Sequence, residues 1–102
     1  MDNILKELKE VEIKKLNETQ IIQLQKLFDE LKKYWFIYDM DRETNHLSIF
    51  TALYISDNKM SLIDITEKYF IGHRTLDRYL SRYNRLAYKL IKIKFPELLK
   101  LL

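Results

Sequence analysis

Apolar side chains along this chain recur every three or four residues, the spacing that places them on one face of an α-helix. The first set predicts a short helix ending near Leu16 and comprises Ile4, Leu5, Leu8 and Val11. Asn17 and Gln20 then have the spacing of a capping box, so a longer helix of about five or six turns is expected to begin there. Its apolar positions are Ile21, Leu24, Leu27, Phe28, Leu31, Tyr34, Trp35 and Tyr38.

Residues 34–38 are apolar on all sides, so they fit either the buried end of that helix, which we favour, or a short strand. Asp39 to Glu43 predict a polar break, and Asn45 is expected to cap the next helix. The apolar face of that helix is Leu47, Ile49, Phe50, Leu53 and Tyr54.

After a loop at Ser56 to Lys59, Ser61 and Asp64 predict the start of a further helix whose inward residues are Leu62, Ile65 and Tyr69. A turn at Ile71-Gly72 then leads into a long last helix from His73 to about Lys94, which Pro96 ends. With one Gly and one Pro, the chain has few residues for hairpin turns. We therefore predict an all-α domain spanning 1–102.

Within that domain we expect three parts. Residues 45–95 form a tri-helical core containing a helix-turn-helix, and residues 96–102 form a short apolar tail. The helices of residues 1–44 either brace this core or form a homodimer. In a dimer, DNA half-sites would lie about one helical turn apart.

The predicted last helix carries its positive charges on one side. Its cations are spaced 4, 4, 3, 4 and 3 residues apart and are Arg74, Arg78, Arg82, Arg85, Lys89 and Lys92. At about 100° per residue, they fall within roughly 80° of one face. Residues 59–95 have a net charge of +6, whereas the rest of the chain has −3. Charge concentrated in this way favours a polyanionic partner, although a solvated basic helix is the simpler alternative.

The residues before this helix fit a DNA-binding helix-turn-helix. Thr66 supplies a small residue in the first helix, Ile71 a buried aliphatic in the turn, Gly72 a cap and Leu76 an inward aliphatic. Phe70 stands where the backbone is often left-handed and glycine is common. Either the turn has another shape, or Phe70 is strained.

Residues 47–90, with Asp-Ile-Thr-Glu-Lys-Tyr-Phe-Ile and Arg-Thr-Leu-Asp-Arg-Tyr, resemble the promoter-reading C-terminal domain of bacterial sigma factors. They are equally similar to ArpU-type regulators of Gram-positive phages and mobile elements. The resemblance implies a cytoplasmic, sequence-specific binder of double-stranded DNA whose last helix enters the major groove. It does not imply contact with RNA polymerase, because the core-binding region of sigma factors has no counterpart here.

On that resemblance, the base-contacting candidates are His73, Arg74, Asp77, Arg78 and Ser81. Arg74 and Arg78 suit bidentate contact with guanine. Asp77 accepts from cytosine or, as we favour, holds one of these arginines. The phosphate-contacting candidates are Lys59, Ser61, Thr75, Arg82, Arg85, Lys89 and Lys92.

Other classes of protein have less support. The chain has no cysteine and no apolar run of about 20 residues, so we expect neither a thiolate site nor a membrane span. The Asp39, Asp41 and Glu43 series lacks the glycine and closing glutamate of a calcium loop, and we expect no metal, no cofactor and no enzymatic activity. The alternatives to a DNA-binding regulator are a protein-interaction module with the same fold and a winged variant that contacts DNA through a hairpin.

Overall fold

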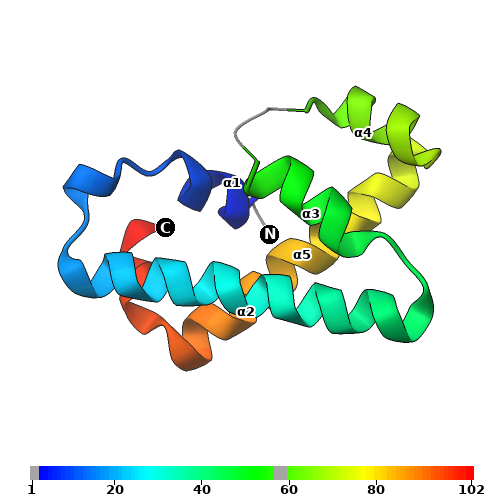
Figure 1. Cartoon of the computed structure of the whole chain (residues 1–102). Helices are drawn as coiled ribbons and strands as arrows, with labels where there is room; N and C mark the ends of the chain where they lie inside the picture. Colours follow the sequence, from blue (N-terminus) through cyan, green and yellow to red (C-terminus); the bar gives the residue numbers. More distant parts are fainter. Residues whose placement is uncertain (1–2, 57–59) are drawn as a thin grey trace.

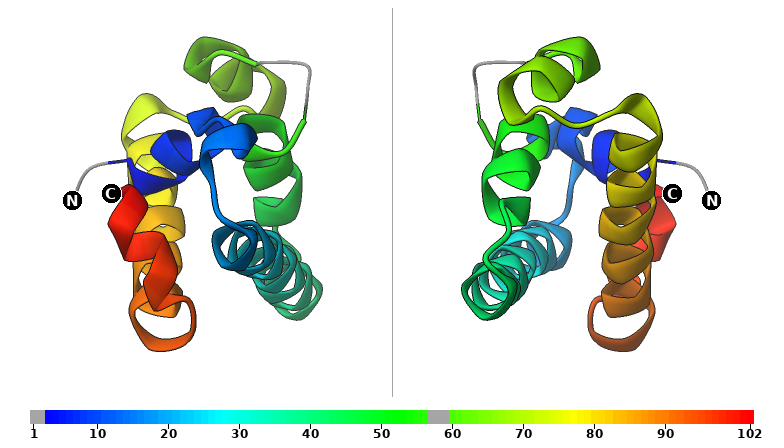
Figure 2. Two further views of the ribbon diagram at one scale, coloured as in Figure 1. Left: turned by 90° about the vertical axis from the view of Figure 1, so that its left-hand side faces the viewer. Right: turned by 90° about the vertical axis from the view of Figure 1, so that its right-hand side faces the viewer.

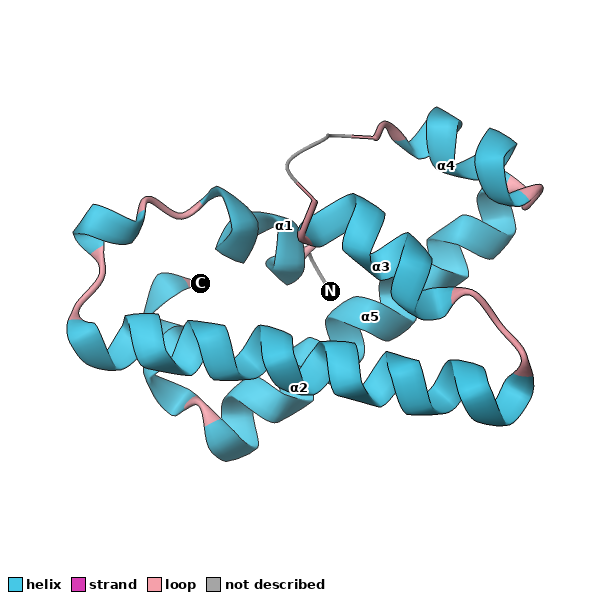
Figure 3. Ribbon diagram, viewed as in Figure 1, coloured by secondary structure: helices cyan, strands magenta, loops and turns pink. Residues whose placement is uncertain are grey.

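The computed structural model describes residues 3–56 and 60–102, and this part of the chain is helical, with no strand (Figure 3). Its elements are α1 (Ile4–Glu10), the 3-10 helix η1 (Ile13–Lys15), α2 (Glu18–Arg42), α3 (His46–Tyr54), α4 (Leu62–Tyr69), α5 (His73–Lys94) and the 3-10 helix η2 (Pro96–Leu101). The predicted all-α class is confirmed. The alternative of a strand over 34–38 is wrong, because these residues lie inside α2.

The long helices α2 and α5 set the overall arrangement (Figure 1). α3 packs on α2, α1 packs against α5 and α3, and η2 turns back to contact both α5 and α2. In the side views, α4 lies at one end of the molecule, close to the first turns of α5 (Figure 2). The solvent side of α5 therefore extends along one flank of the molecule, with α4 beside its beginning.

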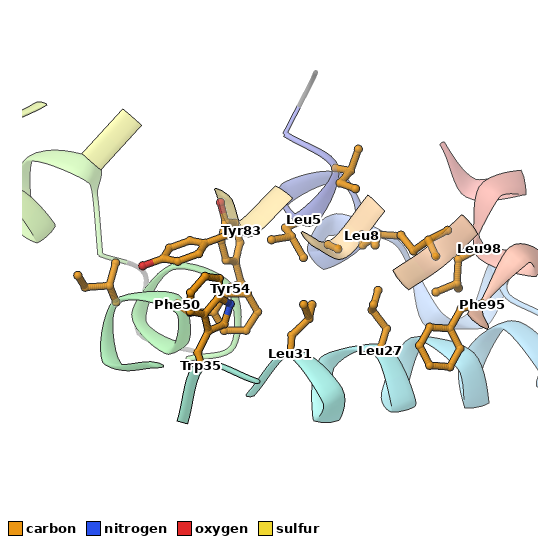
Figure 4. Packing of buried hydrophobic residues seen from close by; sticks show 14 of the residues in the cluster. Leu5, Leu8, Leu27, Leu31, Trp35, Phe50, Tyr54, Tyr83, Phe95 and Leu98 are labelled. Atoms are coloured by element: carbon orange, nitrogen blue, oxygen red, sulfur yellow. The ribbon is translucent and has the colours of Figure 1, made fainter. Parts of the chain in front are cut away.

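Every α-helix contributes to one hydrophobic core (Figure 4). Its fully buried side chains include Leu5, Leu8, Leu27, Leu31, Phe50, Ile65, Leu76, Tyr83, Ile91 and Leu98. Each large apolar side chain removed from water in this way contributes roughly 1.5–3 kcal/mol. The helices of residues 1–44 thus share their core with those of residues 45–95, and the tail inserts Leu98 into the same core.

The C-terminal ends of α1 and α2 differ from the sequence prediction, whereas the start of α2 agrees with it. α1 ends at Glu10 rather than near Leu16, because a 3-10 turn follows. The Asn17–Gln20 capping box is confirmed: the Gln20 amide donates to Asn17 Oδ1 at 2.8 Å and the Asn17 amide donates to Gln20 Oε1 at 3.1 Å. At the other end, the predicted break over 39–43 is wrong, since α2 continues through Arg42.

Asp39 links the end of α2 to the start of α3. Its carboxylate accepts hydrogen bonds from the amides of His46 at 2.8 Å and Leu47 at 2.7 Å, and from the Thr44 hydroxyl at 2.5 Å. The Asn45 side chain, the predicted cap, makes no capping bond. An anionic acceptor at the first amides of a helix satisfies donors that have no partner within the helix, and it complements the helix dipole.

The connection between α4 and α5 contains a strained residue. Phe70 has φ 54° and ψ 45°, the left-handed conformation that side chains with a Cβ disfavour, and its side chain is 95% exposed. Ile71 donates its amide to the Thr66 carbonyl at 3.2 Å, and Gly72 then caps α5 with an extended backbone. Of the two sequence alternatives, the strained Phe70 is the one observed.

The inward face of α4 is narrower than predicted. Ile65 is fully buried and Tyr69 is half-buried, but Leu62 is 47% exposed. Leu62 is the first residue of the helix, directly after the Ser61–Asp64 capping box, which is confirmed. The prediction of an inward Leu62 is therefore wrong, and α4 is held to the core mainly through Ile65.

Replacing Asp39 with Ala should lower the free energy of unfolding by about 1–2 kcal/mol, because the first two amides of α3 lose their side-chain acceptor. Urea unfolding followed by circular dichroism measures this. Asp41→Ala is the matched control, since Asp41 is exposed and its ion pair with Arg42 lies on the surface. Equal effects of the two substitutions would contradict the capping role.

Phe70→Gly should raise the free energy of unfolding by about 0.5–1 kcal/mol, because glycine adopts the left-handed conformation without a steric penalty. Phe70→Ala retains the Cβ and should give no such gain. The difference between the two variants separates backbone strain from removal of an exposed ring. Thermal unfolding of both variants tests it, and equal melting temperatures would refute the strain.

Candidate nucleic-acid interface

The inner face of α5 is anchored by two adjacent polar residues. Asn84 is buried; its Oδ1 accepts the Leu5 amide at 2.9 Å, and its Nδ2 donates to the Leu80 carbonyl at 2.8 Å. Tyr83 is fully buried, and its hydroxyl lies 2.7 Å from His46 Nδ1. These bonds tie α5 to α1 and to α3, so its rotation about its own axis is fixed.

That rotation leaves the basic stripe on the solvent side of α5. All of its members are exposed: Arg74, Arg78, Arg82, Arg85, Lys89 and Lys92. None of them forms an ion pair with a carboxylate in residues 3–56 and 60–102. By contrast, Lys94, at the end of the same helix, pairs with Glu30 at 3.1 Å. The stripe therefore presents positive charge that no ion pair with this part of the chain neutralises.

The base-contacting candidates outside the stripe also lie on the surface. His73, Asp77 and Ser81 are exposed within the first three turns of α5, the same turns that carry Arg74 and Arg78. Asp77 forms no ion pair with either arginine in the described structure, so the favoured role of Asp77 as their holder has no support here. Its carboxylate is left free to accept from another group.

The remaining phosphate candidates are less uniform. Thr75 is half-buried, and Ser61 is exposed but already accepts the Asp64 amide in the α4 capping box. A serine hydroxyl engaged in this way retains its own proton for donation. Lys59 lies outside the described residues. Of the predicted site residues, those of the stripe and of the first turns of α5 are thus the ones that are exposed on a single helix.

Residues of α2 that the sequence prediction did not include border the stripe. Arg82 Nη1 donates to the Tyr38 hydroxyl at 3.4 Å, and the guanidinium of Arg42 lies 4.3 Å from the centre of the Tyr38 ring. Tyr34 lies one turn before Tyr38, with its ring 6.3 Å away. The periodicity of one helix cannot predict that Tyr38 lies beside Arg82, because α2 and α5 come together only through tertiary packing.

A second cluster of ionisable groups lies in the core. His46 is 3% exposed and is enclosed by aromatic rings of Trp35, Tyr38, Tyr79 and Tyr83, whose centres are 4.5–5.6 Å from its own. Burial lowers its pKa below 6.5; nearby Asp39 opposes this shift, and Arg82 reinforces it. Nδ1 of a neutral imidazole can accept a hydrogen bond from the Tyr83 hydroxyl, and burial raises the pKa of Tyr83.

This cluster predicts a loss of stability in weak acid. Because the pKa of His46 is lower in the folded protein, the unfolded chain binds more protons as the pH falls below about 6.5. The free energy of unfolding should therefore fall with pH from about 6.5 until the folded-state pKa is passed, by at most about 1.4 kcal/mol per pH unit for one proton.

Urea unfolding between pH 5 and 8 measures this slope. His46→Phe should flatten it, although the variant is less stable because the buried Tyr83 hydroxyl loses its partner. His73→Gln, which changes an exposed histidine at the start of α5, is the control and should keep the wild-type slope. An unchanged slope in His46→Phe would exclude His46 as its source.

The described residues show neither a metal-binding cluster nor a membrane-spanning helix. They contain no group of three or more metal-ligating His, Cys, Asp or Glu side chains. No helix among them is both long and apolar enough to cross a membrane. Comparison with protein-family models, curated proteins and solved structures gives no match. The case for a function therefore rests on the geometry and charge of this chain's own residues.

Proposed function

We propose that this protein binds double-stranded DNA in a sequence-specific manner, as a transcription regulator or accessory factor of a phage, plasmid or other mobile element. The observation that carries the proposal is the stripe on α5: its six cations are exposed along one face and unpaired with carboxylates among the described residues. An unneutralised row of this kind complements the phosphates of a duplex.

The arrangement of α4 and α5 supports the same proposal. The connection between the two helices is residues 70–72, and Ile65 and Leu76 are buried on either side of it. Ile71 is half-buried, which suits the aliphatic position of a helix-turn-helix. We infer that α5 is the recognition helix and that its first turns enter the major groove.

The proposed mechanism divides the helix into two parts. Arg74 and Arg78 project from the early turns, where they would reach base edges; Asp77 between them would accept from cytosine. Arg85, Lys89 and Lys92 lie farther along and would meet phosphates. Neutralising phosphates releases counterions, so affinity from this second part depends on salt and not on base sequence.

An exposed apolar surface on α4 favours a second candidate, a protein-interaction module. Leu62 and Ile63, at the start of α4, and Phe70, directly after it, are 47%, 60% and 95% exposed. An acidic protein with apolar contacts would suit both this surface and the stripe. Duplex DNA and such a protein differ in one respect that can be measured, because only DNA binding selects a base sequence.

Selection of a randomised duplex pool on the purified protein, followed by sequencing, tests the proposal. An enriched motif is expected, and its symmetry would give the number of protomers that dock. Retention without enrichment would contradict sequence-specific recognition. Absence of retention at low salt would remove DNA binding altogether and favour the protein partner.

Variants separate the two parts of the helix. Arg74→Ala or Arg78→Ala should relax preference at one or two base pairs, by about 1–3 kcal/mol of discrimination each. Lys92→Ala should weaken all duplexes alike and lower the salt slope by about one. Lys26→Ala on α2, which removes an exposed lysine without an ion pair in the described structure, is the control and should bind as wild type. Unchanged preference in an Arg74→Ala, Arg78→Ala double variant would overturn the recognition-helix assignment.

A further inference from the structure

A cleft of about 310 Å³ lies between α2 and α5, on the flank where the stripe passes the aromatic end of α2. Its α2 wall is aromatic and consists of Tyr34, Trp35 and Tyr38; its α5 wall consists of Arg82, Arg85, Leu86 and Lys89. Among the described residues, none that lines it is acidic. Aromatic rings facing several cations form an environment suited to a ligand that is both planar and anionic.

The two tyrosines have different roles in this wall. Tyr38 is occupied, because the Arg42 guanidinium lies over its ring at 4.3 Å and its hydroxyl accepts from Arg82 at 3.4 Å. Tyr34 is 45% exposed; Trp35 contacts its ring edge-to-face at 4.9 Å, and the nearly parallel Tyr38 ring lies 6.3 Å away. Tyr34 is therefore the ring available for stacking, and it is held in place by the core.

The cations of the opposite wall are also available. Arg85 and Lys89 form no ion pair or hydrogen bond among the described residues, and Arg82 engages only the neutral Tyr38 hydroxyl. The nearby carboxylates of α2 are already engaged, since Asp39 caps α3 and Asp41 pairs with Arg42. These carboxylates thus do not neutralise the positive charge in the cleft, and an anionic ligand can do so.

We propose that this cleft binds a phosphorylated nucleoside, with the base stacked on Tyr34 and the phosphate held by Arg85 and Lys89. Such a ligand has two sources, a free mononucleotide or one nucleotide of a single strand. The inference adds to the proposed function and rests on it, because both assign the binding of phosphate to the cations of α5. It adds a base-stacking site on α2, which duplex binding does not require, because the bases of a duplex are stacked on one another.

Calorimetric titration of the full chain with adenosine 5′-monophosphate tests the inference, with Trp35 fluorescence as a second signal, because this is the only tryptophan of the chain. Saturable binding is expected, and it should be much weaker for adenosine and for inorganic phosphate alone. Inorganic phosphate binding as tightly as the nucleotide would overturn the stacking role of Tyr34.

Paired variants identify the two walls. Tyr34→Ala should weaken nucleotide binding about tenfold, as expected for the loss of one stacking contact. Phe36→Ala removes a comparably exposed aromatic from the outer side of the same helix and should have no effect. Arg85→Ala should also weaken binding, whereas Lys26→Ala, which removes one charge elsewhere, should not. Equal losses in Arg85→Ala and Lys26→Ala would reduce the effect to overall charge and refute the cleft.

Competition by a short single-stranded oligodeoxyadenylate distinguishes the two sources. Displacement of the mononucleotide by the strand supports a strand-borne nucleotide, and failure to displace it supports a free one. Tyr34→Ala titrated with duplex separates this inference from the proposed function, because Tyr34 has no role in the proposed duplex binding. If the unmodified protein binds duplex but no nucleotide, the nucleotide site in the cleft is refuted and the proposed function stands. If it binds the nucleotide but no duplex, the proposed function is refuted and the nucleotide site stands.

Discussion

The hydrogen bond between Tyr83 and His46 is the contact on which the arrangement of α5 depends. Both side chains are buried, so each would be left unpaired in the core if α5 were rotated or shifted, at a cost of about 1–3 kcal/mol for each group. The adjacent Asn84 bonds the Leu5 amide in a direction about 100° away. Tyr83 and Asn84 thus attach α5 to both α3 and α1. The side of α5 that is left facing solvent is the side that carries the cations.

Much of the fold follows from local rules that the sequence displays openly. The capping boxes at Asn17 and Ser61 fix where α2 and α4 begin, and the three-and-four spacing of apolar residues fixes which sides of α2 and α5 are buried. The sequence prediction fails where a residue of a local pattern makes a tertiary contact. The charges after Tyr38 suggested a break, yet one of them, Asp39, serves as the cap of the next helix while still inside its own.

His46 shows the same limit in the core. In the sequence it stands after three acidic residues and next to a predicted loop, which suggests a solvated group. It is buried because four aromatic residues, two from α2 and two from α5, converge on it, and their convergence is set by how those helices cross. The stripe on α5 was predictable because one helix carries all of it. The aromatic wall facing Arg85 was not, because it belongs to a helix about 50 residues earlier in the chain.

Two features of the surface around α5 lower the stability of the folded protein. Phe70 holds a left-handed backbone with its ring in water, where a glycine would be more stable. Like charges three or four residues apart along the stripe repel one another by about 0.2–0.5 kcal/mol per pair. The core tolerates both costs, since α5 buries its other face over most of its length. A polyanion laid along the stripe would remove the repulsion, so binding would stabilise the same helix that free folding leaves under electrostatic strain.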